Sequence, residues 1–81
     1  MPSYYVYILT DVATATHHYT GFTTNLQDRL HKHNEGGVPS TAPNKPWRIE
    51  TAIAFTDEKK ARNFESYLKS HSGRAFASKH F

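Results

Sequence analysis

The chain contains no cysteine among its 81 residues. This absence excludes a disulfide framework and a thiolate zinc site as the means of stabilising so small a protein. It also suits a reducing compartment, so we expect a cytoplasmic protein. The sequence has no apolar run near the roughly 20 residues that a membrane-spanning helix needs, and its N-terminus lacks a basic region followed by an apolar one. Neither secretion nor membrane insertion is therefore expected.

The chain is also too short for two hydrophobic cores, so we expect a single domain over residues 1–81. Hydrophobic residues make up 37% and aromatic residues 14%, which is enough for a small core and too much for a disordered chain. Ten Lys and Arg against seven Asp and Glu give a net charge of +3. This excess favours a polyanionic partner only weakly, because many ordinary soluble domains share it.

Three segments have the composition and alternation of β-strands. Aromatic and branched residues fill Tyr4–Leu9, and Asp11–Thr16 is typical of a turn leading to a second strand at His18–Phe22. In Trp47–Phe55, positions 47, 49, 51, 53 and 55 form one more apolar face, with polar or small residues between them. The sequence therefore predicts a hairpin and a third strand.

A helix is predicted over Asn25–Glu35, between the hairpin and the third strand. Thr24 and Gln27 match the capping-box pattern at its start, and Gly36 is placed to end it. The following stretch, Gly36–Pro46, is rich in Gly and Pro and is predicted to be an exposed loop.

A second helix is predicted over Asp57–Ser70, with Thr56 as its cap. Ser72-Gly73 is then expected to break the chain, leaving Arg74–Phe81 as a final helical turn or two packed on the body. The order β-β-α-β-α-α describes an α+β fold, in which helices flank a small three-stranded antiparallel sheet.

Ionisable residues interrupt the apolar faces of both predicted helices. Arg29 and His33 fall on or beside the stripe that Leu26 and Leu30 define, and Glu65 lies on the apolar stripe of the second helix. A carboxylate is rarely buried unless it is paired or binds a metal. Glu65 therefore either forms an ion pair with Arg29 or serves as a metal ligand, and taken alone the ion pair is the more ordinary of the two.

The order of these polar residues resembles the GIY-YIG endonuclease superfamily. Tyr5-Val6-Tyr7 is similar to the first name motif and Tyr19-Thr20-Gly21 to the second, although Tyr5 replaces a glycine and Thr20 an isoleucine. Arg29 stands at the position of the catalytic arginine, His33-Asn34 matches the pair that often follows, and Glu65 resembles the single metal-binding glutamate.

The tail over residues 68–76 is similar to that of the small stand-alone bacterial members rather than to the nuclease domain of excision-repair incision proteins. The resemblance implies a metal-dependent endonuclease that hydrolyses DNA, in DNA repair or recombination. Its cofactor would be Mg²⁺ or Mn²⁺, bound by Glu65, because Mg²⁺ accepts a lone carboxylate and keeps several waters. Arg29 would grip the phosphate.

The group that activates water stays open between Tyr7, Tyr19 and His33, all three of which are candidate catalytic residues. A tyrosine with a pKa of about 10 is a poor base at neutral pH unless cations lower that value, whereas a histidine near 6.5 is chemically adequate. Tyrosines in strands are also often plain sheet residues.

The expected partner is DNA, which for a structure-directed enzyme includes branched or single-stranded forms. Dispersed basic residues are candidates for holding its backbone: Lys32, Lys45, Arg48, Lys69 and Arg74. Two other interpretations compete with the enzyme. The first is a non-catalytic nucleic-acid-binding module that acts with a partner protein, and the second is a structural domain that contains an Arg29–Glu65 pair. The oligomeric state stays open.

Overall fold

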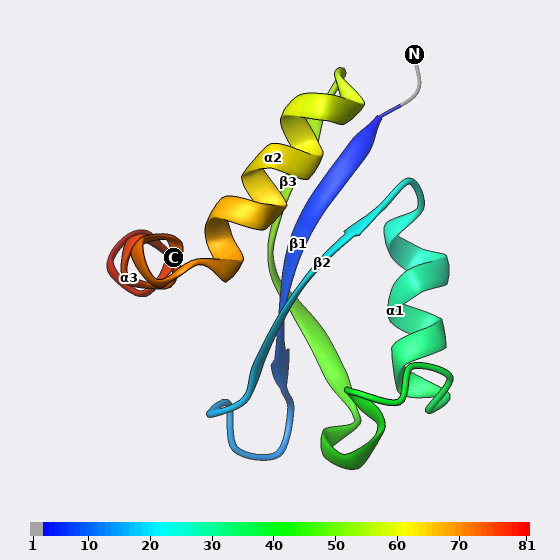
Figure 1. Ribbon diagram of the computed structural model, residues 1–81. Coiled ribbons are helices and arrows are strands. Elements are labelled where there is room, and N and C mark those ends of the chain that lie inside the picture. Colours follow the sequence, from blue (N-terminus) through cyan, green and yellow to red (C-terminus); the bar gives the residue numbers. More distant parts are fainter. Residues whose placement is uncertain (1–2) are drawn as a thin grey trace.

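Three strands and three α-helices make up residues 3–81, which the computed structural model describes (Figure 1). The strands form one antiparallel sheet in the order β2-β1-β3, so β1 is the central strand. The predicted element order and the α+β class are confirmed. The elements are β1 (Tyr4–Asp11), β2 (His18–Thr23), α1 (Leu26–Asn34), the short 3₁₀ helix η1 (Ala42–Asn44), β3 (Trp47–Phe55), α2 (Glu58–Lys69) and α3 (His71–His80).

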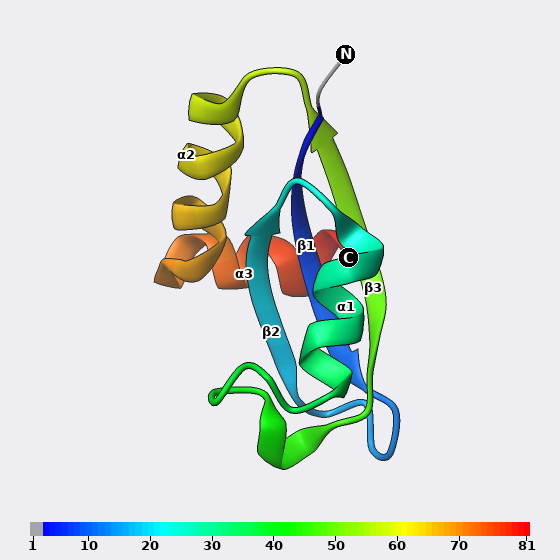
Figure 2. The ribbon, with the colours of Figure 1, turned by 90° about the vertical axis from the view of Figure 1, so that its right-hand side faces the viewer.

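The helices cover both faces of the sheet, with α1 on one side and α2 and α3 on the other (Figures 1 and 2). Alternate residues of β1 point to opposite faces and fill two separate cores. Val6 and Ile8 pack with Leu68 of α2. Leu9 packs instead with Leu30 of α1. The central strand therefore contributes side chains to the hydrophobic cores on both faces of the sheet.

A β-bulge in β3 moves its apolar residues from one face to the other. The pairing with β1 runs through Thr51 and then Ile49, which leaves Glu50 as the extra residue. One inserted residue reverses the side-chain parity of a strand. Ile49 and Trp47 consequently pack on the α1 side, whereas Phe55 packs on the α2 side. The prediction that the alternating residues of this strand share one face is therefore wrong.

The caps of the first two helices lie one residue later than predicted. Asn25 caps α1, since its side chain accepts a hydrogen bond from the backbone N–H of Asp28 at 3.1 Å. Asp57 caps α2 in the same way. The caps predicted at Thr24 and Thr56 are wrong because each threonine is followed by Asn or Asp, which are the stronger capping residues.

The end of α1 agrees with the prediction. Gly36 has a φ of 80°, and its N–H donates to the carbonyl of His33, while the N–H of Gly37 donates to that of Lys32. This is the Schellman arrangement that a glycine in the left-handed region permits. The loop that follows is less exposed than predicted, because it contains η1 and the buried Thr41.

The last helix is longer than predicted and starts before the expected break. Ser70 caps α3 by accepting a hydrogen bond from the N–H of Gly73 at 3.1 Å, so Ser72-Gly73 lies in its first turn. A Cβ at Gly73 would overlap the backbone carbonyl of Tyr67. Glycine is therefore used here for close packing between α2 and α3, and the prediction of a chain break is wrong.

Candidate active site

Tyr7 lies in the centre of the sheet on the α1 side, with 3% of its surface exposed. It pairs in register with Gly21 of the edge strand β2, and a Cβ at Gly21 would overlap the Tyr7 phenol. Tyr19 lies two residues before this glycine and presents its ring on the same face. The ring centroids of Tyr7 and Tyr19 are 6.5 Å apart. The missing side chain at Gly21 thus gives the Tyr7 phenol its place over the edge strand.

His33 of α1 contacts both tyrosines. Its ring meets that of Tyr19 edge-on at a centroid distance of 5.0 Å, and its Nε2 lies 2.9 Å from the Tyr7 hydroxyl. On the other side of the ring, Nδ1 lies 2.7 Å from the hydroxyl of Thr41. His33 itself is 1% exposed. The imidazole is therefore held between two hydroxyl groups inside the protein.

The direction of this hydrogen-bond chain follows from its far end. The Thr41 hydroxyl donates to the backbone carbonyl of Val38 at 3.2 Å, so it accepts from His33. The proton of the neutral imidazole must then sit on Nδ1, which leaves Nε2 as an acceptor. The Tyr7 hydroxyl accordingly donates to Nε2. Each buried member of the chain has a partner, as groups of this kind require.

Both titratable members of the chain are neutral at pH 7. Burial raises the pKa of the Tyr7 phenol well above its ordinary value of 10.0, and the nearby Arg29 charge only partly opposes this shift. Burial also lowers the pKa of His33 below 6.5, and the Arg29 charge adds to that effect. A protonated phenol thus faces an unprotonated imidazole nitrogen.

Thr41 is the member of this site that the sequence did not predict. It lies in the Gly- and Pro-rich loop after α1, where no periodicity distinguishes it from neighbouring polar residues. A hydrogen bond fixes the backbone of Thr41, because the indole N–H of Trp47 donates to the Thr41 carbonyl at 2.8 Å. The side chain of Asn34 in turn makes two hydrogen bonds to the backbone of Trp47. Asn34 therefore braces the site by tying α1 to β3.

Arg29 is half-buried on α1, one turn before His33. Its positive charge acts to lower the pKa of both Tyr7 and His33. Within residues 3–81 its side chain has neither a salt bridge nor a hydrogen bond, so the guanidinium is available to an anion. A planar, permanently charged fork suits the oxygens of a phosphate.

Glu65 lies on α2, which packs on the face of the sheet opposite to α1 (Figure 1). Its side chain is 19% exposed and its carboxylate lies 3.0 Å from Nζ of Lys69. The Glu65 charge contributes to the raised pKa of Tyr7, less than burial does. The alternative pair with Arg29 is not formed in the part of the chain described. The partner of the Glu65 carboxylate is a lysine one turn along the same helix.

The donor set at Glu65 suits a hard divalent cation. No group of three or more His, Cys, Asp or Glu side chains within residues 3–81 is placed to hold a metal. A single, partly exposed carboxylate leaves most coordination positions to water and to substrate oxygens, which is how Mg²⁺ is usually bound. Thiolate or imidazole ligands, which zinc prefers, do not surround this position.

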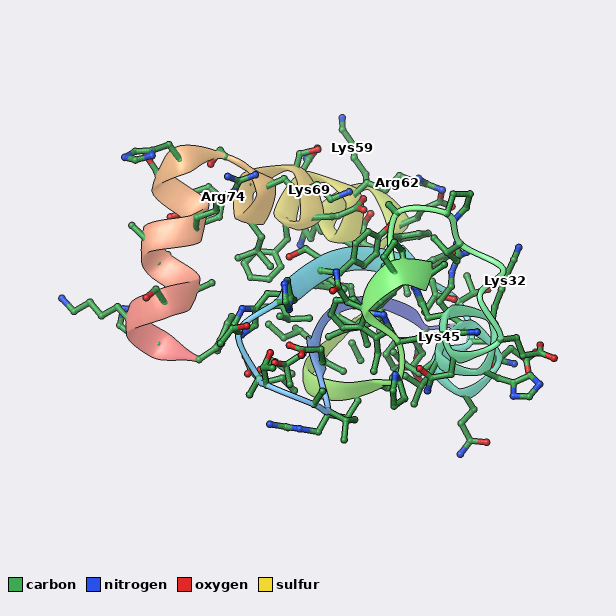
Figure 3. All side chains as sticks on the ribbon, turned by 90° about the horizontal axis from the view of Figure 1, so that it is seen from below. Lys32, Lys45, Lys59, Arg62, Lys69 and Arg74 are labelled. Carbon is green, nitrogen blue, oxygen red and sulfur yellow. The ribbon has the colours of Figure 1, made fainter. Side chains whose placement is uncertain are left out.

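The predicted backbone-binding residues are distributed over three regions. Figure 3 shows Lys69 and Arg74 along α2 and the start of α3, whereas Lys32 and Lys45 lie apart from them beside α1. Arg48 is on β3, the edge strand opposite to β2. The structure thus brings Lys69 and Arg74 together and leaves Arg48 on the far edge of the sheet.

Comparison with known proteins identifies the family of the chain. The model of the GIY-YIG catalytic domain matches residues 3–79. A UPF0213 protein from Bacillus licheniformis is 35% identical over 52 residues, which cover 63% of this chain and 54% of that protein. The matched segment thus spans about half the length of that curated relative.

A solved structure, the solution NMR structure of a UPF0213 protein from Bacillus halodurans, is 30% identical, with a TM-score of 0.56. The match covers 95% of this chain and 83% of that one. None of the helices within residues 3–81 has the length and apolar character to cross a membrane. Because the domain model spans almost the whole chain, the protein belongs to the GIY-YIG family, whose domains are generally nucleases.

Proposed function

We propose that this protein is a metal-dependent endonuclease that hydrolyses DNA phosphodiester bonds and serves DNA repair or recombination. The observation that carries the proposal is the buried chain from Tyr7 through His33 to Thr41, with the charges of Arg29 and Glu65 both acting on the pKa of the Tyr7 phenol. Hydrolysis needs an activated water, a cation for the phosphoryl oxygens and stabilisation of the leaving oxygen. This arrangement offers one group for each need.

The hydrogen-bond direction supports one route for the proton of the attacking water. A protonated phenol can take a proton from water only while it gives its own proton away. The lone pair of His33 Nε2, 2.9 Å from the Tyr7 hydroxyl, is placed to receive that proton. Tyr7 then relays the proton and His33 is the terminal base, with a proton already on Nδ1. The positive charge that forms on the imidazole is held by the Thr41 hydroxyl, which accepts from Nδ1–H.

The remaining residues act on the phosphate. Arg29 would grip its non-bridging oxygens as negative charge develops. Tyr19, edge-on to His33, would orient the imidazole. Glu65 would hold the divalent cation, Mg²⁺ or Mn²⁺, which when bound supplies Lewis-acid polarisation and stabilises the leaving oxygen.

The test is cleavage of plasmid, branched and single-stranded DNA with Mg²⁺ or Mn²⁺, with melting temperature measured on the same samples. Glu65→Gln should lower cleavage by at least about a hundredfold, since even outer-shell partners of a metal site are worth about 10- to 100-fold. Tyr7→Phe should lower it by about 10²- to 10⁴-fold, the usual contribution of general acid–base catalysis. Absence of cleavage of every substrate by the parent protein would refute the proposal.

Glu58→Gln is the matched control, because Glu58 is an exposed carboxylate on the same helix, paired with Arg62. It should cleave as the parent does. Melting of the Glu65→Gln protein should stay within a few degrees of the parent, since an ion pair with a half-exposed lysine stabilises by at most about 1 kcal/mol. A large drop in melting temperature with unchanged cleavage would instead support a purely structural role for Glu65.

A further inference from the structure

A groove of about 810 Å³ lies between α3 and the sheet, on the side opposite to α1. Ile8 and Thr20 of the sheet line it, and so does Ala77 of α3. Its cationic lining residues are Lys69 at the end of α2 and Arg74 at the start of α3, which Figure 3 shows on adjoining parts of the two helices. Tyr19 and the carboxylate-bearing Glu50 also line the groove, so it adjoins the chemical centre described above, although neither Tyr7 nor His33 lines it.

Lys69 connects this groove to the candidate metal ligand. It lines the groove, yet its Nζ lies 3.0 Å from the Glu65 carboxylate, one helical turn back. Half of the Lys69 side chain is exposed, and a flexible lysine can turn from one partner to another. The same ammonium is therefore the natural partner of two different anions: the Glu65 carboxylate and any anion held beside Arg74.

We propose that the groove binds a backbone phosphate of the substrate strand next to the one that is cleaved, and that Lys69 couples its binding to that of the divalent cation at Glu65. A phosphate beside Arg74 draws Lys69 into the groove and leaves the carboxylate without its internal cation. A cation on Glu65 repels Lys69 toward the groove, where its charge joins that of Arg74. Each ligand thus favours the other, by the same factor in both directions. The inference rests on the proposed function, because it takes Glu65 as the metal ligand.

The first experiment measures Mn²⁺ binding without nucleic acid, from the electron paramagnetic resonance signal of free Mn²⁺. Lys69→Met should raise Mn²⁺ affinity about two- to fivefold, the value of a half-exposed ion pair that no longer competes. Lys59→Met, an exposed lysine on the same helix, is the matched control and should bind as the parent does. Equal affinity in the Lys69→Met protein and the parent would overturn the inference.

The second experiment uses a fluorescein-labelled phosphorothioate oligonucleotide, which resists hydrolysis, and measures its binding by anisotropy with and without Mn²⁺. In the parent, Mn²⁺ should raise oligonucleotide affinity by the factor by which the oligonucleotide raises Mn²⁺ affinity. Lys69→Met should remove this coupling, and Arg74→Met should weaken oligonucleotide binding severalfold. Undiminished coupling in the first variant, or undiminished affinity in the second, would refute the role of the groove.

Neither measurement depends on cleavage, so the two proposals can fail separately. If Mn²⁺ binding is lost in Glu65→Gln but is unaffected by Lys69→Met, the coupling is wrong and the nuclease proposal stands. If Glu65→Gln binds Mn²⁺ as the parent does, Glu65 is not the ligand and both proposals fall.

Discussion

The two faces of the sheet are built from alternate residues of the same strand, yet they treat polar groups in opposite ways. On the α2 side Val6, Ile8, Ala61 and Leu68 form a hydrophobic cluster, and the buried Thr10 hydroxyl on the same face has no hydrogen-bond partner among residues 3–81. On the α1 side Tyr7, His33 and Thr41 are buried and hydrogen-bonded in a row. Packing of side-chain volume determines the arrangement on the α2 side, and directional hydrogen bonds determine it on the α1 side.

This contrast indicates which face of the sheet matters more for the stability of so small a protein and which matters more for its function. An apolar core tolerates modest changes in shape and loses stability roughly in proportion to the buried area removed. A buried polar chain stabilises only when every member is satisfied, so a small displacement disrupts all of it. The α1 side should therefore lose function before stability, and the α2 side stability before function.

The largest effect is expected from Gly21→Ala, which acts on the α1 side. The added methyl overlaps the Tyr7 phenol, so the ring must move away from His33. We expect cleavage to fall at least about a hundredfold, the lower limit for losing a positioned acid or base, with a stability loss of about 1–3 kcal/mol for overpacking. DNA cleavage and urea unfolding measure the two. Since steric overlap is the cause, stability changes of Gly21→Ala and Tyr7→Ala should be non-additive; simple additivity would contradict this account.

The opposite pattern is expected from Val6→Ala on the α2 side. Val6 is 2% exposed, and removing two buried methyl groups should cost about 2 kcal/mol. Cleavage per folded molecule should stay within about threefold of the parent, because no hydrogen bond in the Tyr7–His33 chain changes. Fluorescence of the single tryptophan, Trp47, during urea unfolding gives the stability. A hundredfold loss of cleavage would show that the two faces are not separable.

The sequence predicted the sheet and the helices because their signals are local. The bounds of β3 followed from alternation, and the end of α1 from Gly36, whose conformation favours glycine. The alternation did not predict the face of the sheet on which Trp47 and Ile49 lie. That face depends on the bulge at Glu50, which forms through the non-local pairing of β3 with β1. The sequence predicts a break at Gly73, and the structure differs because the packing of this glycine against α2 is equally non-local.

The candidate site was predictable to a different extent. Tyr7, Tyr19, Arg29, His33 and Glu65 were identified by resemblance to a family, and the structure brings Tyr7, Tyr19 and His33 into contact. Thr41 could not be found in this way, because its role depends on where the loop returns to α1. The direction of the proton chain depends on Thr41, so the proton route that we propose through Tyr7 and His33 could not be derived from the sequence.

A smaller effect is expected from Thr41→Val, which removes the hydroxyl and keeps the shape. His33 Nδ1 then loses its partner, and the fixed tautomer is lost with it. We expect a stability loss of about 1–2 kcal/mol for a buried group left unsatisfied, and a cleavage rate whose pH profile shifts relative to the parent. Thr41→Ser should restore both. A serine variant that behaves like the valine variant would show that packing, and not the hydroxyl, is what Thr41 contributes.

The smallest expected effect is a difference in the pH dependence of the unfolding free energy between a variant of the α1 side and a variant of the α2 side. Burial holds the pKa of His33 below its unfolded value near 6.5, so at lower pH the unfolded chain binds more protons than the folded one. The stability that neutral His33 contributes is fully present above pH 6.5 and is lost as pH falls toward its lowered folded pKa. The protein has six histidines, so His33→Gln isolates this contribution. Between pH 8 and 5, His33→Gln should lose less unfolding free energy than the parent, whereas Val6→Ala should lose as much. Equal losses in all three proteins would mean that the imidazole is not held neutral by the α1 side.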